Sequence, residues 1–215
     1  MKGSIYILFL LMLFSSCSIF SEERDRVQLV DIFPEINLSE DEGIYIDSDG
    51  KKINGKRSRN YRNGNLRADL TFSDGLITDG VIRLKDGTLY ADYSIADGLY
   101  YHTQYWPDGK PQMMVVYEGN YNNQTEFHVW HENGTPVVAS NPYFTRTWYE
   151  DGQLRMEILL KDDGEQGIAR TWYMNGELKA ESHFENNPHA GLYREWDEDG
   201  ELIKNRVSSA VSVDE

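Results

Sequence analysis

The sequence lacks the pairs of cysteines that crosslink small domains, and its apolar run is short for a membrane-spanning helix. Cys17 is its single cysteine in 215 residues, so no disulfide can form within the chain. Near the N-terminus, the apolar run from Ile5 to Phe14 has ten residues, whereas a membrane-spanning helix needs about 20. Proline is also scarce, at six residues. The folded part of the chain must therefore be stable through packing alone.

Basic residues are few as well. The chain has 21 Lys and Arg against 36 Asp and Glu, which gives a formal net charge of −15. Nucleic acid is excluded as a partner, because its phosphates require a basic patch. The same balance argues against electrostatic docking on anionic lipid headgroups.

The first residues have the order of a secretory signal peptide. Lys2 supplies a positive start, the apolar run follows, and the small residues Ser15 and Ser16 precede Cys17. A short apolar core followed by small residues is typical of a signal peptide that is cleaved off. The sequence therefore predicts a signal peptide at residues 1–16.

A cysteine directly after those small residues resembles the lipobox of bacterial lipoproteins, with Phe14 standing where that family usually has Leu. In that family the thiol is acylated and the cysteine becomes the new first residue. The resemblance implies that Cys17 anchors the protein to a membrane of the bacterial cell envelope, because several buried acyl chains hold firmly. Ser18, rather than Asp, after it resembles the outer-membrane sorting pattern of hosts with two membranes. The alternative is an ordinary signal peptide with a chance cysteine.

The composition of the rest of the chain favours strands and tight turns. Aromatic residues make up 13% of the chain and glycine occurs 18 times. Asp-Gly or Asn-Gly recurs throughout, which is the strongest local signal of a β-hairpin. The glycines of this repeat are Gly50, Gly64, Gly87, Gly109, Gly134, Gly152, Gly176 and Gly200, at gaps of 14, 23, 22, 25, 18, 24 and 24 residues. A period in this range predicts a repeat architecture.

The residues around each glycine recur too. Four residues before it stand Ile46, Tyr105, Trp130, Trp148, Trp172 and Trp196. Two residues after it stand Leu66, Leu89, Leu154, Leu178 and Leu202, and four after it Ala68, Ala91, Met156 and Ala180. The third and fifth residues after it are mostly charged, for example Arg155 and Glu157. This alternation predicts strands with one buried face and one solvent-exposed face.

The length of each turn decides which side chains face one another. A three-residue loop such as Met174-Asn175-Gly176, with its glycine in the left-handed region, places Trp172 opposite Leu178. A two-residue Asn-Gly turn would instead place Tyr173 opposite Leu178. We expect the three-residue loop, because it puts the recurring Trp and Leu on one face.

The unit from Trp172 to Glu181, followed by Phe184 and Gly191, resembles one unit of a bacterial MORN-variant repeat. Residues 148–167 and 196–204 are similar to it. Many proteins with this repeat carry an antitoxin family name. The resemblance implies an all-β fold, an elongated and twisted antiparallel sheet of six to eight stacked β-hairpins, in which each hairpin packs on its neighbours.

Two positions depart from the repeat. Pro111 and Pro136 replace the leucine expected two residues after the glycine, and because proline cannot donate to a sheet ladder, we expect irregular pairing there.

The repeats divide the chain into four expected segments. These are the signal peptide at 1–16, a lipid-anchored tether at 17–42, the β-hairpin repeat domain at 43–205 and a flexible acidic tail at 206–215. An apolar patch from Val27 to Phe33 in the tether is placed to pack onto the first hairpin.

Polar residues give little sign of a catalytic or metal site. His128 and His131 are three residues apart, which in a strand puts them on opposite faces. Asp47-Ser48-Asp49-Gly50 resembles the start of a calcium loop, but Ser58 stands where the EF-hand has its final Glu, so turn chemistry explains the segment. We expect no catalytic residue, no metal and no cofactor. A hydrolase whose groups come from separate loops is an alternative.

The recurring aromatic positions are the candidate binding residues. Tyr105, Trp130, Trp148, Trp172 and Trp196 share one slot of the repeat. They are either the packing layer of the sheet or an exposed patch of the kind that docks a partner.

We therefore expect a non-catalytic scaffold or protein-binding module, held at the bacterial cell envelope by its lipid anchor, with an envelope protein as partner. One alternative is a carbohydrate or cell-wall binder that uses the Trp and Tyr face, although the Gly-Trp pairs of choline-binding repeats are absent. The family label implies an antitoxin that neutralises a toxin, but an exported protein would be in the wrong compartment for a cytoplasmic toxin.

Overall fold

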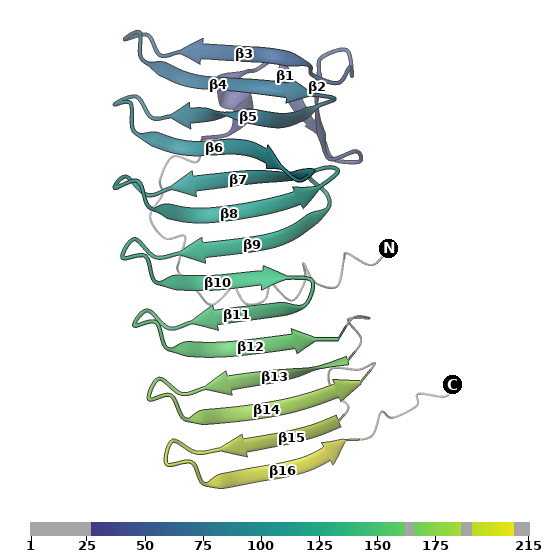
Figure 1. Cartoon of the computed structure of the whole chain (residues 1–215), viewed down its shortest axis with the longest axis vertical. Coiled ribbons are helices and arrows are strands. Elements are labelled where there is room, and N and C mark those ends of the chain that lie inside the picture. The colour runs from purple at the N-terminus through teal and green to yellow at the C-terminus, as the bar shows by residue number, and fades with distance from the viewer. Residues whose placement is uncertain (1–26, 162–165, 186–190, 209–215) are drawn as a thin grey trace, which may run out of the picture.

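The computed structural model describes residues 27–161, 166–185 and 191–208, and this part of the chain is almost entirely β-structure (Figure 1). Fourteen strands form one antiparallel sheet in strict chain order, from β3 at one edge to β16 at the other. A short helix and a separate two-stranded sheet precede it. The predicted all-β architecture of stacked hairpins is confirmed, with seven hairpins in the large sheet.

The elements have the following bounds. The N-terminal segment holds α2 (Leu29–Ile32), β1 (Ile36–Ser39) and β2 (Ile44–Asp47). The first half of the large sheet holds β3 (Gly55–Asn60), β4 (Leu66–Ser73), β5 (Leu76–Arg83), β6 (Leu89–Ala96), β7 (Leu99–Tyr105), β8 (Pro111–Glu118) and β9 (Gln124–Trp130). The second half holds β10 (Pro136–Asn141), β11 (Phe144–Trp148), β12 (Leu154–Leu160), β13 (Gln166–Trp172), β14 (Leu178–Glu185), β15 (Gly191–Trp196) and β16 (Leu202–Ser208).

The seven Asx-Gly loops lie along one rim of the sheet, at the left in Figure 1. In the loop of Gly176 the backbone N–H of Tyr173 donates to the carbonyl of Glu177 at 2.9 Å, and Gly176 N–H donates to the carbonyl of Tyr173 at 3.0 Å. Gly176 has φ = 92°, a value that glycine adopts without a steric penalty. Asn175 Oδ1 accepts the N–H of Glu177 at 3.0 Å. The predicted three-residue loop, with Trp172 opposite Leu178, is confirmed.

The strict alternation expected after each glycine is wrong, because every hairpin carries a bulge beside its loop. In the β13–β14 pair the register shifts between Thr171 and Trp172, so that Trp172 faces Leu178 while Thr171 faces Ala180. Neighbouring residues of a strand point to opposite faces. Ala180 therefore lies on the face opposite to Trp172, whereas strict alternation would have put Leu178 and Ala180 on the same face.

The same bulge accommodates the two prolines. The register shifts next to Pro111 and next to Pro136, as expected. It also shifts in hairpins that have leucine at this position, as in the pair of Trp148 with Leu154. The position lies outside the regular ladder, and this explains why it tolerates a residue without an N–H.

The turn of Gly50 belongs to the N-terminal segment and begins no strand of the large sheet. Its backbone bond runs from Asp47 N–H to the carbonyl of Lys51, and an isolated bridge joins Ile46 to Lys52. This explains why the first gap of the repeat, 14 residues, is shorter than the others.

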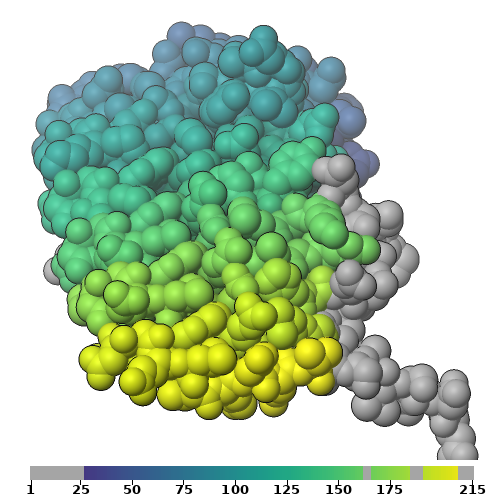
Figure 2. Space-filling view, turned by 60° about the horizontal axis from the view of Figure 1, so that its bottom comes forward, coloured from purple at the N-terminus to yellow at the C-terminus, as the bar shows by residue number. Residues whose placement is uncertain are grey.

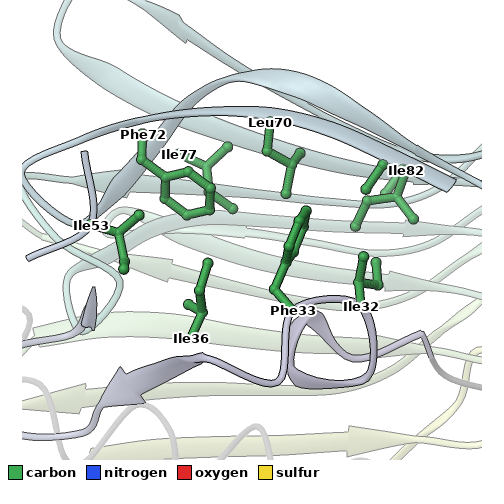
Figure 3. Close-up of a cluster of buried hydrophobic side chains, with 10 residues drawn as sticks. Ile32, Phe33, Ile36, Ile53, Leu70, Phe72, Ile77 and Ile82 are labelled. Carbon is green, nitrogen blue, oxygen red and sulfur yellow. The ribbon is translucent and has the colours of Figure 1, made fainter. Parts of the chain in front are cut away.

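The main core lies where the N-terminal segment covers one face of the first strands. Ile32, Phe33 and Ile36 project from α2 and β1 toward Leu70 and other apolar residues of β4 and β5 (Figure 3). Phe33, Ile36 and Leu70 are at most 1% exposed. The apolar patch of the expected tether therefore packs onto the sheet, over the first two hairpins.

The second half of the sheet is packed far less densely. A small cluster of Val129 on β9 with Val137 and Val138 on β10 lies where the two halves meet. From β11 to β16, Gly167 is the only buried residue among those that the structure describes. The strand pairing also continues into the expected tail, since β16 runs as far as Ser208.

The N-terminal cover predicts a clear stability effect. Phe33→Ala should lower the free energy of unfolding by about 3–5 kcal/mol, because it leaves a cavity between α2 and β4. Val30→Ala, in the same helix at a side chain that is 43% exposed, should cost far less. Denaturant unfolding of the two variants measures the difference, and equal midpoints would contradict the assignment of this core.

Candidate functional site

The five predicted aromatic residues all lie on one face of the sheet, here called the tryptophan face. Each ends the first strand of a hairpin and faces the residue two positions after the glycine: Tyr105 with Pro111, Trp130 with Pro136, Trp148 with Leu154, Trp172 with Leu178 and Trp196 with Leu202. Two residues before them stand Thr103, His128, Arg146, Arg170 and Arg194. An unbroken row of paired residues across β7 to β15 connects these five positions. The aromatic side chains therefore share a face.

All five aromatic side chains are half-buried. They are neither sealed inside the sheet nor fully open to solvent. The indole of Trp130 stacks on the ring of His128, with centroids 5.7 Å apart and planes within 12°. Each ring thus presents part of its surface, and the Trp130 ring is held by its stacking on His128.

A ladder of alternating charges lies beside the aromatic row in the second half of this face. Arg146 Nε donates to Glu157 Oε1 at 2.8 Å, and Arg170 Nε donates to Glu181 Oε2 at 2.8 Å. Arg170 Nη1 also lies 3.9 Å from Glu157 Oε2, which links the two pairs. The side chains of Glu157 and Glu181 are only 13% and 14% exposed. The ladder crosses four strands and fixes the polar part of the tryptophan face.

Glu181 lies within hydrogen-bond distance of two side chains, Arg170 and His183. Partial burial alone would raise its pKa, but hydrogen bonds from Arg170 and His183 lower the pKa below its usual value. His183 Nε2 lies 3.1 Å from Glu181 Oε1. The carboxylate acts as an acceptor that orients the Arg170 guanidinium and the His183 ring.

A second recurring position, missed in the sequence, joins one hairpin to the next along the rim. It is the residue immediately after the Trp slot. Tyr61 Oη, Trp106 Nε1, Tyr149 Oη and Tyr173 Oη donate to the carbonyls of Arg83, Trp130, Trp172 and Trp196 at 2.8–3.1 Å. Three of these rings also make a cation–π contact with the third residue after the glycine. In one of them, Arg155 Cζ lies 5.7 Å from the centroid of the Tyr149 ring. The recurrence of aromatic residues here was the available signal.

The opposite face of the first hairpins carries a cluster of tyrosines rather than a polar ladder. The ring of Tyr121 lies 5.4 Å from that of Tyr45 and 5.1 Å from that of Tyr117, and Tyr121 Oη accepts the N–H of Ile77 at 2.9 Å. Burial raises the pKa of Tyr45 to about 12. The cluster ties the β8–β9 loop to the N-terminal segment.

His102 stacks on Tyr93 in the same region, with centroids 4.5 Å apart and planes within 11°. Burial lowers the pKa of His102 from 6.5 to about 4. The imidazole is therefore neutral at pH 7 and serves as a packing group.

The remaining predicted candidates are turn residues or lie outside the described residues. His131 begins the loop of Gly134, where its N–H donates to the carbonyl of Thr135. Asp47 Oδ1 accepts the N–H groups of Asp49 and Lys51 at 2.9 Å, which is the turn role expected of it. Among the described residues no group of three or more His, Cys, Asp or Glu is placed to hold a metal ion. Cys17 and residues 1–16 lie outside the described residues.

The neutral His102 predicts a pH dependence of stability. The folded state binds fewer protons than the unfolded state between pH 6.5 and 4, so the contribution of His102 is complete above pH 6.5 and is lost as the pH falls toward 4. Over this range the wild type should lose about 3 kcal/mol more stability than His102→Gln. Urea unfolding of both proteins at several pH values measures this difference. The carboxylates titrate equally in both, so parallel curves would contradict a depressed pKa for His102.

Comparisons with known proteins place one repeat in a family. Residues 165–186 match the MORN repeat variant family. No curated protein matches the chain. In the described residues no helix is long and apolar enough to cross a membrane.

Solved structures resemble the chain only weakly. A mutant of TarM from S. aureus in complex with fondaparinux, alpha-GlcNAc-glycerol and UDP has 8% identity and a TM-score of 0.23, covering 60% of this chain and 20% of that one. The GtfA/B complex bound to UDP and GlcNAc has 14% identity and a TM-score of 0.22, covering 61% and 25%. TcdB2-TccC3-TEV has 12% identity and a TM-score of 0.26, covering 80% and 12%. This chain thus spans a quarter or less of each of these proteins, and it contains a MORN repeat variant within a sheet of seven hairpins.

Proposed function

We propose that this chain is a non-catalytic repeat scaffold, tethered through an acylated Cys17 to a membrane of the bacterial cell envelope, that binds an envelope protein on its tryptophan face. The sheet of β-hairpin repeats and the MORN repeat variant fit a scaffold or binding module. The lipobox-like N-terminal sequence supports the anchor.

The observation that carries the binding proposal is the alignment of Tyr105 and the four tryptophans in one half-buried row. Half-buried aromatic side chains bring large contact areas at a low entropic cost, because they have only two side-chain torsions to fix. The Arg146–Glu157–Arg170–Glu181 ladder beside the row supplies oriented polar groups. A hydrophobic strip with a polar border is the usual composition of a protein interface.

A glycan is the second candidate ligand. Flat aromatic rings beside charged hydrogen-bonding side chains, as at Trp172 and Arg170, also suit a sugar ring and its hydroxyl groups. The anchor does not distinguish between the two, since cell-wall glycans lie in the same compartment.

The anchor is tested by replacing the acylated residue. Cys17→Ser should move the protein from the membrane fraction to the soluble fraction of lysed cells, because the described part offers no spanning helix and the net charge is −15. Mass spectrometry of the wild type should detect a lipid-modified Cys17. A Cys17→Ser protein that stays with the membranes would contradict the lipid anchor.

The binding face is tested by crosslinking in intact cell envelopes. The double variant Trp172→Ala/Trp196→Ala should reduce the yield of a crosslinked partner at least tenfold. Met156→Ala, a half-buried residue on the opposite face of β12, is the matched control and should leave the yield unchanged. Thermal unfolding must show that all variants are folded at the assay temperature.

Two outcomes distinguish the ligands. Loss of a protein crosslink in the tryptophan variant alone supports a protein partner. Retention of purified cell-wall glycan by the wild type, with loss in the same variant and no protein crosslink, would replace the protein partner with a glycan.

A further inference from the structure

The free edge of β16 carries two cationic side chains, although the protein as a whole is acidic with a formal net charge of −15. Among the residues that the structure describes, β16 is the last strand of the large sheet and pairs on one side only, with β15. Its outer side therefore presents unpaired backbone N–H and C=O groups, which are a template for one more strand. Figure 2, with the bottom of the molecule turned forward, shows the C-terminal strand uncovered across most of the width of the sheet.

The side chains of β16 are accessible. All the described residues from Glu201 to Val207 are exposed, and among the apolar ones Leu202 is 52%, Ile203 59% and Val207 79% exposed. An edge strand with exposed apolar side chains is a place where another chain can add by backbone pairing.

Two cations define one side of this edge. Lys204 and Arg206 face Glu195 and Tyr193 in the register of β15 and β16, so they lie on the face opposite to the tryptophans. Lys204 Nζ and Arg206 Cζ lie 5.5 Å and 4.9 Å from the centroid of the Tyr193 ring. Glu195 is their one neighbouring carboxylate in this register, with Oε2 at 3.7 Å from Lys204 Nζ. On this face of β16 two cations therefore lie beside the Glu195 carboxylate of β15.

The other side of the edge continues the charge ladder without completing it. The residue paired with Arg194 on β14 is Glu181, but on β16 it is Asn205. The ladder thus passes from a cation to a neutral amide at its last strand, and the exposed Val207 lies two residues farther along on the same face.

Like charges disfavour a second copy of the chain at this edge. In a two-fold pairing of β16 with itself, Lys204 and Arg206 of one copy come close to the same residues of the other. Head-to-tail pairing would bring them to β3, whose sequence Gly-Lys-Arg-Ser-Arg-Asn carries three cations. Like charges facing each other across a strand pair are destabilising.

We propose that the outer edge of β16 binds an extended acidic segment of the partner protein as a fifteenth strand. Its carboxylates alternate with apolar residues, so that the carboxylates meet Lys204 and Arg206 on one face and the apolar residues meet Val207 on the other. This inference rests on the proposed binding function and adds to it the chemistry of the partner and a second contact surface.

The test uses the full chain and two fluorescent peptides of equal length, one alternating Glu with Val and the other alternating Lys with Val. Fluorescence anisotropy should show the acidic peptide binding at least tenfold more tightly than the basic one, and the difference should shrink at high salt. Hydrogen exchange should show protection of β16 amides by the acidic peptide.

Charge reversal supplies the decisive variants. Lys204→Glu/Arg206→Glu should invert the preference, so that the basic peptide binds more tightly. Arg57→Glu, at a half-buried cation of the opposite edge strand β3, is the control and should leave the preference unchanged. Equal binding of both peptides, no binding of either, or a preference that survives the charge reversal would overturn the proposal. So would self-association of the wild type with protection of β16, because a second copy would then occupy the edge.

The two proposals fail separately. If the envelope crosslink is lost in Trp172→Ala/Trp196→Ala but the peptides bind without preference, binding at the tryptophan face is supported and binding at the β16 edge is contradicted. If the acidic peptide binds the β16 edge but the crosslink is unchanged in Trp172→Ala/Trp196→Ala, binding at the edge is supported and binding at the tryptophan face is contradicted.

Discussion

The three-residue Asx-Gly loop, with the bulge that follows it, is the constraint on which the sheet depends. The glycine adopts φ near 90° in each of the seven loops, from Gly64 to Gly200. In six of them the Asx side chain accepts the N–H of the residue after the glycine, as Asn63 does from Asn65 at 3.1 Å. Loop and bulge together fix the register of every hairpin, because a shift by one residue would turn each side chain to the other face.

The stacking of hairpins follows from this fixed register. With every loop at the same rim, the residue after the Trp slot reaches the backbone of the next hairpin, as Tyr149 reaches the carbonyl of Trp172. An isolated hairpin is only marginally stable in water, and each hairpin here is stabilised by these contacts with its neighbours. Pairs such as Arg155 over Tyr149 add a cation from the bulged strand to the same rim.

The apolar surface of the sheet is covered differently in its two halves. In the first half, Phe33 and Ile36 of the N-terminal segment cover the strands and form a dry core. In the second half, neutralising pairs such as Arg170 with Glu181 cover one face, and the aromatic rings are only half-buried. A surface made in this way leaves part of each aromatic ring accessible, which is why we propose that a partner binds there.

Much of the fold could be predicted from the sequence. The Asx-Gly period predicted six to eight stacked hairpins, of which the large sheet has seven. The loop at Met174-Asn175-Gly176 predicted that Trp172 faces Leu178, because this is a local effect of turn geometry. The tertiary structure decided what depends on distant contacts. The segment from Val27 to Phe33 packs over β4 and β5, and the ladder from Arg146 to Glu181 forms because stacking brings four strands into one register. A local pattern fixes each turn, but which face is covered depends on packing between residues far apart in the chain.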